Sequence, residues 1–191
     1  IFRAKSNKEL IFAFSCLTSD NSKISVSTLF YSYNHPNSGS YVYRPAGEVM
    51  TLYDEGDLRR DISITTLDNL DFINKYPSGQ TGTDPMVISR LAEMYLISAE
   101  AQGVEKGLPR LNELRNRRGL ANIYPSSEAK FIDALLEERR RELLCENHRW
   151  YDLVRLGKAV EVLGIQPYQT LMPVPASERA ANKNLTQNDG Y

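Results

Sequence analysis

The sequence ERRRELLCENHRWYDLVRLG, from Glu138 to Gly157, decides the fold because it places charged and apolar residues on the same face of a helix. A helix that begins near Ser127 carries Phe131 and Leu135 on one apolar stripe. Steps of three and four residues continue this stripe into the charged residues that follow. We therefore expect several of these charges to be at least partly buried.

Buried charges persist only when they are paired and hydrogen-bonded. We accordingly predict one structural network in this stretch, with the members Arg139, Glu142, Glu146, Arg149, Trp150 and Asp152. Trp150 is expected to cover the ion pairs. The stretch is interpreted as an internal brace, and function is expected on the loops that it supports.

Composition places the chain among globular proteins and gives no sign of a polyanionic partner. It has 191 residues, 41% of them apolar, which suffices for one compact domain or part of a larger one. The net charge is -1 and the pI is about 6.2, so neither nucleic acid nor an anionic membrane surface is expected as a partner. The two cysteines form no disulfide framework or metal-ligand spacing.

The first third of the chain predicts short strands and loops. Leu10 to Phe14 and Ile24 to Tyr33 are rich in β-branched and aromatic residues, with a break at Asp20 to Ser22. A short helical turn is expected over Val49 to Tyr53. Residues 1–86 are therefore expected to form a part rich in strands and loops.

Four tyrosines flank the predicted loop Asn34 to Ser40. Tyr31 and Tyr33 precede the loop, and Tyr41 and Tyr43 follow it. In an extended chain, two residues spaced by two point the same way, so each pair of rings can face a flat ligand. The alternative is a hairpin whose tyrosines cover the core and keep their hydroxyls in water.

Helical periodicity follows from residue 87 onward. A helix is predicted from Val87 to Gln102, ended by Gly103 and Gly107, and a second from Leu108 to Arg118, stopped by Gly119. The short connection implies antiparallel packing. This pair resembles one tetratricopeptide unit, which needs other elements to bury its faces.

A third helix is predicted from Ser127 to about Glu146, and a fourth from Trp150 to Leu156, ended by Gly157. After Val162 the periodicity is lost, and prolines favour an extended chain. We predict a mainly α fold in one domain, in which a helix pair and a long buried helix form the core, residues 87–157, and residues 158–191 form an irregular tail.

Catalytic and metal-binding patterns are weak in this sequence. His35 and His148 have no second ligand at metal spacing, so no metal and no cofactor are expected. Glu93 and Glu100 lie about 10 Å apart on one helix, near the wide end of inverting glycosidase geometry. We interpret them as structural carboxylates neutralised by arginines, with Arg115, Arg117, Arg118 and Arg139 as the candidates, and predict no catalytic residue.

Acidic residues near position 57 are also given a structural interpretation. Asp54, Asp57 and Asp61 have a spacing that suggests a calcium loop, but the glutamate required at the twelfth position is absent. We expect Asp57 and Asp61 to pair with Arg59 and Arg60.

Four blocks in this order resemble the SusD/RagB family of glycan- and nutrient-binding outer-membrane proteins of Bacteroidetes-type bacteria. They are RLAEMYLISAEA (Arg90 to Ala101), LNELRNRRGL (Leu111 to Leu120), ERRRELLCENHRWYDLVRLG and MPVPASE followed by NLTQNDGY. The resemblance implies a non-enzymatic protein that binds an oligosaccharide and delivers it to a SusC-like, TonB-dependent transporter. In this family, ligand contacts come from loops and aromatic side chains, which makes Tyr31, Tyr33, Tyr41 and Tyr43 the candidate ligand-binding residues.

The resemblance also implies a place at the cell surface, on the outer membrane. Because the chain begins with Ile1 instead of Met, we expect it to be the C-terminal portion of such a protein, with a lipid anchor on a preceding segment. The alternative function is a tetratricopeptide-like scaffold that recognises a peptide segment of a protein partner.

Overall fold

The structure is a computed structural model that describes residues 7–17, 19 and 26–191. The chain divides into two compact units, Ile1–Glu146 and Asn147–Tyr191, called here the first and second units. The fold is mainly helical with a few short strands, as predicted from the sequence. No helix within the described residues is both long and apolar enough to cross a membrane.

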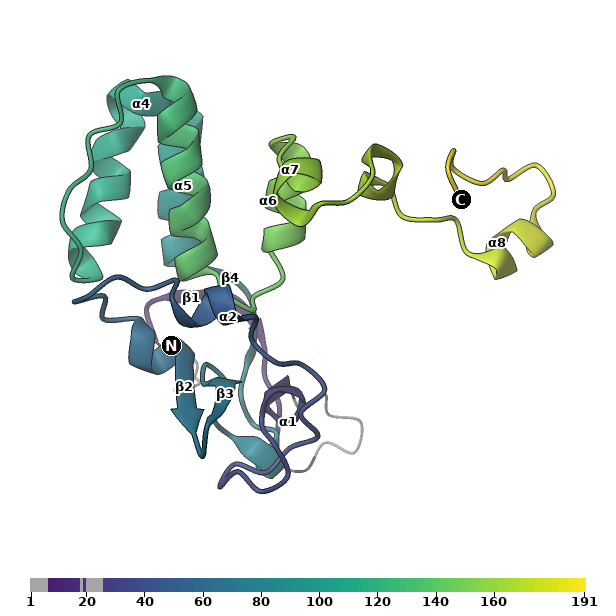
Figure 1. The fold of residues 1–191 in the computed structure, drawn as a ribbon, viewed down its shortest axis with the longest axis horizontal. Coiled ribbons are helices and arrows are strands. Elements are labelled where there is room, and N and C mark those ends of the chain that lie inside the picture. Colours follow the sequence, from purple (N-terminus) through teal and green to yellow (C-terminus); the bar gives the residue numbers. More distant parts are fainter. Residues whose placement is uncertain (1–6, 18, 20–25) are drawn as a thin grey trace. The chain divides into compact units, whose positions relative to one another are not determined.

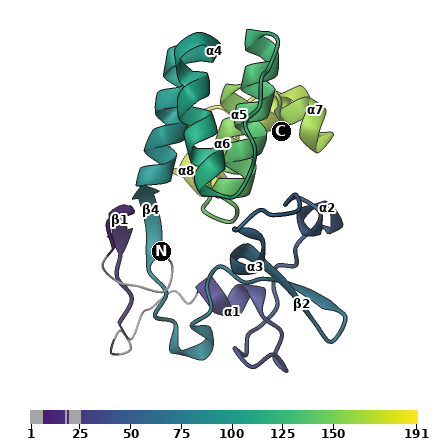
Figure 2. The same ribbon diagram turned by 90° about the vertical axis from the view of Figure 1, so that its left-hand side faces the viewer.

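Two helices form the core of the first unit. Helix α4 covers Leu91–Arg117 and helix α5 covers Glu128–Glu142. Gly103 interrupts α4 with non-helical angles, φ 65° and ψ -175°, so that α4 consists of two legs. The legs and α5 stand side by side in both ribbon views (Figures 1 and 2). Their shared core contains Ala92, Leu96, Ala99, Leu111, Leu114, Phe131, Leu135 and Leu143.

The two legs of α4 run antiparallel, as predicted, and touch through a glycine. The Tyr95 hydroxyl lies 3.3 Å from Glu113 Oε1 on the opposite leg. A Cβ atom added to Gly107 would lie only 1.9 Å from the carbonyl oxygen of Ala99. Gly107 is therefore inside the second leg, where its missing side chain permits a close approach of two backbones, and Gly103 alone makes the break.

Helix α5 begins as predicted and ends earlier than predicted. Ser127 caps its start, with a side-chain oxygen that accepts a hydrogen bond from the Lys130 backbone N–H at 3.3 Å. The expected continuation to Glu146 is wrong, because the helix ends at Glu142 and Cys145 has a φ of 58°. The polar contacts of this end, described below, give the reason.

Two small antiparallel sheets complete the first unit. Strand β1, Leu10–Phe14, pairs with β4, Met86–Arg90; strand β2, Ile64–Leu67, pairs with β3, Leu70–Ile73. The strand predicted over residues 10–14 is confirmed. The predicted helix start at Val87 is wrong, because this residue pairs with Ala13 and the chain stays extended up to the first residue of α4.

Short helical elements connect these parts. They are α1, Val26–Phe30; α2, Gly47–Met50; α3, Arg60–Ser63; and the 3-10 helix η1, Gly79–Thr81. The strand expected over Ile24 to Tyr33 is wrong for residues 26–30, which are helical, while Ile24 and the predicted break at Asp20 to Ser22 lie outside the described residues. In that segment tertiary packing overrides the β propensity of its residues.

The second unit consists of short helices. They are α6, Arg149–Arg155; α7, Ala159–Leu163; η2, Pro167–Thr170; and α8, Ala176–Ala181. Gly157, with a φ of 68°, ends α6 as predicted. The last residues are fixed by contacts within the unit, since the Tyr191 hydroxyl donates to the Leu171 carbonyl at 2.8 Å.

We predict that Gly107→Ala destabilises the first unit, because its Cβ would overlap the Ala99 carbonyl oxygen. The expected loss is about 1–3 kcal/mol in the free energy of unfolding, measured by urea denaturation. Gly47→Ala is the control, because a Cβ there meets no atom within 4 Å. Equal denaturation midpoints for the two variants would contradict the close approach.

Candidate functional site

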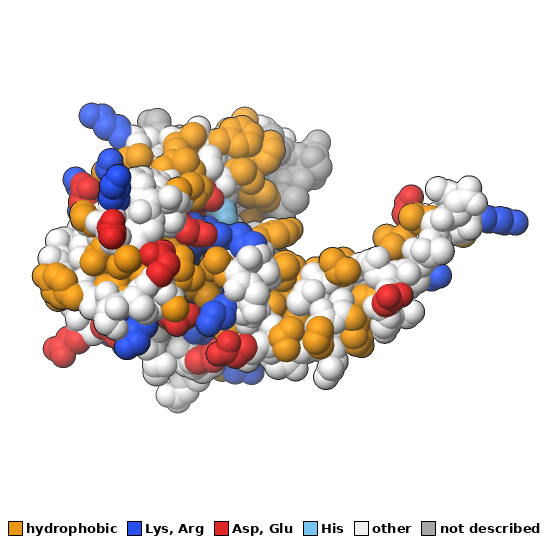
Figure 3. All heavy atoms as spheres, turned by 90° about the horizontal axis from the view of Figure 1, so that it is seen from above, with side chains coloured by type: hydrophobic (Ala, Val, Ile, Leu, Met, Phe, Trp, Pro, Cys, Tyr) orange, Lys and Arg blue, Asp and Glu red, His pale blue; other side chains and the backbone are white. Residues whose placement is uncertain are grey.

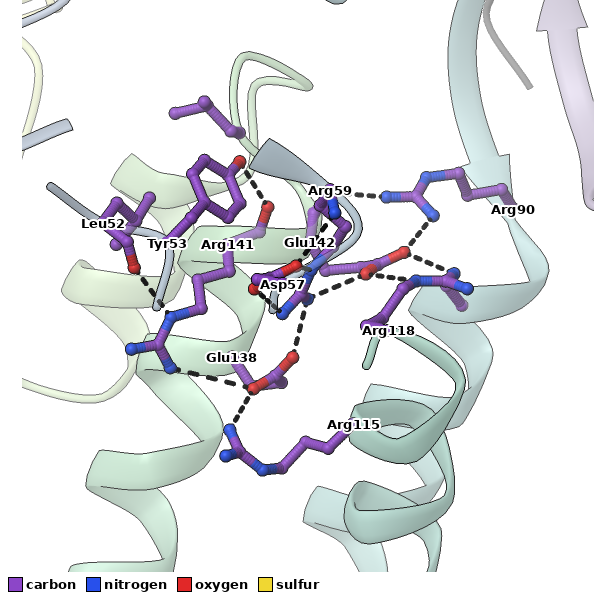
Figure 4. A network of polar contacts seen from close by, with 12 residues as sticks. Leu52, Tyr53, Asp57, Arg59, Arg90, Arg115, Arg118, Glu138, Arg141 and Glu142 are labelled. Atoms are coloured by element: carbon purple, nitrogen blue, oxygen red, sulfur yellow. Dashed lines mark hydrogen bonds and ion pairs between the residues drawn. The ribbon is translucent and has the colours of Figure 1, made fainter. Parts of the chain in front are cut away.

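Glu142, the last residue of α5, lies at the centre of a buried ion-pair network. Its Oε1 accepts hydrogen bonds from Arg90 at 2.7 Å and Arg118 at 2.8 Å, and its Oε2 accepts from Arg118 and Arg59, both at 3.0 Å. The three guanidinium groups come from β4, from the end of α4 and from the segment before α3, and they converge on this one carboxylate (Figure 4). One charge thus joins four parts of the chain.

Glu138, one turn earlier in α5, extends the network. It accepts hydrogen bonds from Arg59 at 2.6 Å and Arg115 at 2.7 Å. Arg59 also binds both carboxylate oxygens of Asp57, through Nε at 2.8 Å and through a terminal nitrogen at 2.7 Å. The predicted pairing of Asp57 with Arg59 is therefore confirmed, and it forms part of a larger network.

Glu146 binds a second group of cations beyond the end of α5. It accepts from Lys75 Nζ at 2.5 Å and from Arg90 Nε at 2.7 Å. Arg90 also donates to Glu9, at 3.1 Å, beside strand β1. Arg90 therefore connects the two carboxylates of this end with the small sheet.

Side chains that bind the last backbone carbonyl groups of α5 explain why the helix stops at Glu142. The last carbonyls of a helix lack partners within the helix and carry its negative dipole end. Here side chains from elsewhere in the first unit satisfy them. Lys75 Nζ donates to the carbonyls of Glu142 and Leu144, the Arg90 guanidinium donates to that of Glu142, and the Tyr53 and Tyr76 hydroxyls donate to those of Arg141 and Cys145. A continued helix would use these carbonyls itself.

The ionisation of the network follows from competition between burial and charge. Burial alone would raise the pKa of Glu142, but the hydrogen bond from Arg118 and the charge of Arg90 outweigh it and hold the pKa well below its usual range. The same balance, with Lys75 and Arg90 as cations, lowers the pKa of Glu146. Burial lowers the pKa of Lys75 despite its pairing with Glu146. Both carboxylates are therefore ionised at neutral pH.

The residues predicted for the network are divided between the two units. Glu142 and Glu146 lie in the network of the first unit, and Arg139 is buried there on α5. Arg149, Trp150 and Asp152 belong to the second unit, where Asp152 pairs with Arg155 at 2.9 Å.

Sequence reasoning missed Arg59, Lys75, Arg90, Arg115, Arg118, Asp57 and Glu138 as members of the network. The arginines, Lys75 and Asp57 lie more than twenty positions from Glu142, where helical periodicity gives no signal. Glu138 lies only one turn before Glu142 on the same helix and was overlooked although helical spacing relates the two.

The tyrosine loop, residues 33–44, and Tyr31 just before it are held to the first unit by two tyrosine hydroxyls. The Tyr31 ring is 0% exposed, and its hydroxyl donates to Asn74 Oδ1 at 2.8 Å. The Tyr41 hydroxyl donates to the Asp71 carbonyl at 2.8 Å. Tyr31 therefore belongs to the core, and its ring offers no surface to a ligand. The alternative interpretation is correct on this burial but wrong on the hairpin and on the hydroxyl, because α1 is helical and the Tyr31 hydroxyl binds Asn74.

Tyr33 and Tyr43 instead present their rings to solvent. Their exposed fractions are 83% and 57%. The predicted side-by-side pairs are not formed, because helix α1 precedes Tyr31 and because Tyr41 adopts a φ of 49°, which turns the chain. The guanidinium of Arg44 lies 5.3 Å from the centre of the Tyr41 ring. The loop thus combines exposed aromatic rings with a cation.

The other candidates for chemistry have structural surroundings. Arg115, Arg117 and Arg118, expected to neutralise Glu93 and Glu100, pair with Glu138, Glu113 and Glu142. Within the described ranges, no group of three or more His, Cys, Asp or Glu is placed to hold a metal ion. Basic and acidic side chains are interspersed on the face drawn in Figure 3.

Comparison with known proteins identifies the class of this fold. The model of the SusD family matches residues 65–170, which include the helical core and most of the network. The chain belongs to the SusD family.

Two curated relatives match over part of their length. SusD-like protein P38 of Formosa agariphila is 34% identical over 126 residues, which is 56% of this chain and 24% of the relative. The starch-binding protein SusD of Bacteroides thetaiotaomicron is 33% identical over 117 residues, 53% of this chain and 21% of that protein. The match therefore covers about a quarter of the length of these relatives.

Solved structures show the same fold over nearly the whole chain. A laminarin-binding SusD-like protein aligns with a TM-score of 0.82 and 25% identity, over 100% of this chain and 51% of its own. Surface glycan-binding protein A from Bacteroides thetaiotaomicron aligns with a TM-score of 0.78 and 23% identity, over 95% of this chain and 52% of its own. The chain therefore spans about half the length of these two proteins.

We predict that Glu142→Gln lowers the free energy of unfolding by about 3–5 kcal/mol, because the buried Arg59 and Arg90 and the partly buried Arg118 would lose the anion that they share. Chemical denaturation measures this loss. Glu105→Gln, on the exposed surface of α4, is the control and should leave stability nearly unchanged. A loss below about 1 kcal/mol for Glu142→Gln would show that the carboxylate is not required.

Acidification should also weaken the network. The folded-state pKa values of Glu142 and Glu146 lie below the unfolded value, about 4.3 for Glu, so their stabilisation is complete above about pH 5 and declines as the pH falls through the folded values. Unfolding midpoints measured from neutral to acidic pH should fall, and less steeply for Glu142→Gln. Parallel curves for the two proteins would contradict this assignment.

Proposed function

We propose that this protein binds carbohydrate without cleaving it, and that the tyrosine loop supplies contacts to the sugar. The observation that carries the proposal is the exposure of Tyr33 and Tyr43 on a loop that hydrogen bonds anchor, through Tyr41 within the loop and Tyr31 just before it. Sugar rings have flat C–H faces that pack on aromatic rings, and hydroxyls that bind polar groups. Arg44, whose guanidinium lies over the Tyr41 ring, supplies such a polar group in the same loop.

Anchoring matters because a binding surface that is already ordered loses less entropy when the ligand binds. Tyr31 packs against Phe72, with ring centres 5.9 Å apart, and Tyr41 packs against the same ring at 5.2 Å. Phe72 lies on β3 and is buried. The exposed rings therefore stand on a loop with a rigid base.

Membership of the SusD family supports this proposal, since relatives include proteins named for binding starch and laminarin. We further propose that the full protein is held to the outer membrane at the cell surface by a lipid and delivers oligosaccharide to a TonB-dependent transporter, a proposal that membership of the SusD family supports. A peptide-binding scaffold is the rival function, and pull-down of a protein partner without any carbohydrate binding would favour it.

The proposal predicts that Tyr43→Ala and Tyr33→Ala each weaken oligosaccharide binding about tenfold, a loss of about 1.4 kcal/mol, because an aromatic contact is removed. Isothermal titration calorimetry with starch and laminarin oligosaccharides measures the effect. Tyr124→Ala is the matched control, since Tyr124 is 79% exposed and lies between α4 and α5, away from the loop in sequence. Unchanged affinity in both loop variants would refute a role for the loop in binding. Release of reducing sugar by the pure protein would refute the proposal that the carbohydrate is bound without cleavage.

A further inference from the structure

A cavity of about 220 Å³ opens beside the network in the first unit. Its lining consists of Leu58, Arg59, Ile62, Ser63, Lys75, Arg90, Arg117, Arg118 and Glu142. Five of these nine residues are cationic and one is anionic. The volume is smaller than the roughly 300–1,000 Å³ of sites for drug-sized ligands, so it suits a small charged group or a single sugar residue.

The charges of the network are arranged unevenly around this cavity. Each buried cation has a carboxylate partner, but Asp57, Glu138 and Glu146 are not among the lining residues. Glu142 alone faces the cavity, and its single charge is shared by Arg59, Arg90 and Arg118. The cavity is therefore bordered mainly by the cationic side of the network, and low-dielectric walls strengthen such a field.

The lining of the cavity includes exposed side chains of two kinds, a guanidinium and two apolar groups. The Arg117 side chain is 65% exposed and its ion pair with Glu113, at 3.0 Å, lies on the surface, where it is weak. Leu58 and Ile62 are exposed apolar side chains in the same lining. The Arg117 guanidinium can leave Glu113 and bind an oxyanion of a ligand. Leu58 and Ile62 can pack against C–H groups of the same ligand.

We propose that this cavity binds an oxyanion, a carboxylate or sulfate group, through Arg117 and Arg118, and that the oxyanion is carried on a sugar whose C–H face rests on Leu58 and Ile62. Arg118 is a partly exposed residue of the lining, and Glu142 orients its guanidinium through two hydrogen bonds. The proposal that a sugar carries the oxyanion rests on the carbohydrate-binding function proposed above. The proposal that the cavity binds an oxyanion does not depend on that function.

Calorimetric titration with D-glucuronate, inorganic sulfate and D-glucose tests this site. Glucuronate should bind more tightly than glucose, and added salt should weaken its binding because the interaction is electrostatic. Binding of glucuronate in preference to sulfate identifies a sugar-borne group, while binding of sulfate in preference to glucuronate identifies a free anion and overturns the sugar as carrier. Equal binding of glucuronate and glucose, or no binding of either anion, overturns the site.

Arg117→Ala should weaken glucuronate binding about tenfold, the effect of losing one charge-assisted hydrogen bond. This residue is exposed, so the fold should persist, and the thermal unfolding midpoint checks that it does. Arg110→Ala is the matched control, since Arg110 is an exposed arginine of the same leg of α4 whose guanidinium lies near Tyr95. An equal loss in both variants overturns the assignment to the cavity.

The tyrosine variants separate this site from the function proposed above. Tyr43→Ala should leave glucuronate binding unchanged while it weakens binding of neutral oligosaccharides. If neutral oligosaccharides fail to bind but glucuronate binds and depends on Arg117, the proposed tyrosine site fails and the oxyanion site stands. If glucuronate binding is lost in Tyr43→Ala, the separate oxyanion site fails.

Discussion

The first unit depends on the pairing of one buried carboxylate, Glu142, with three guanidinium groups. A buried carboxylate without partners would destabilise the fold, and so would any of the three arginines without an anion. Because Arg59, Arg90 and Arg118 come from three different parts of the chain, each part must reach its position for the charges to be satisfied. The network therefore favours one arrangement of the sheet, the helix pair and α5.

The same constraint ends α5 and organises the chain beyond it. Lys75, Arg90, Tyr53 and Tyr76 bind carbonyl groups at this end, so the backbone leaves the helix and Glu146 turns back toward Lys75. Lys75 and Tyr76 follow strand β3, whose Phe72 supports the tyrosine loop. Structural charge pairing and the exposed rings are thus connected through a short, continuous stretch of chain.

The sequence predicted much of the helical core and little of the site. The sequence predicted three helix boundaries: the cap at Ser127, the break at Gly103 and the stop at Gly119. These could be predicted because each residue acts on its neighbours in the chain. The partners of Glu142 were not readable, because no periodicity relates residues that are tens of positions apart. Similarly, the spacing of Tyr31 and Tyr33 suggested a shared face, but Tyr31 is buried with its ring against Phe72, while Tyr33 is exposed.

The sequence by itself determined a mainly α fold, the boundaries marked by glycines and caps, and the presence of buried charges near Glu142. These features arise from local backbone preferences and from the period of a helix. Only the tertiary structure decided which cations neutralise those charges, where α5 ends, and which tyrosine rings face solvent. Each of these depends on groups brought together from distant parts of the chain, where burial makes pairing obligatory but leaves the choice of partner to packing.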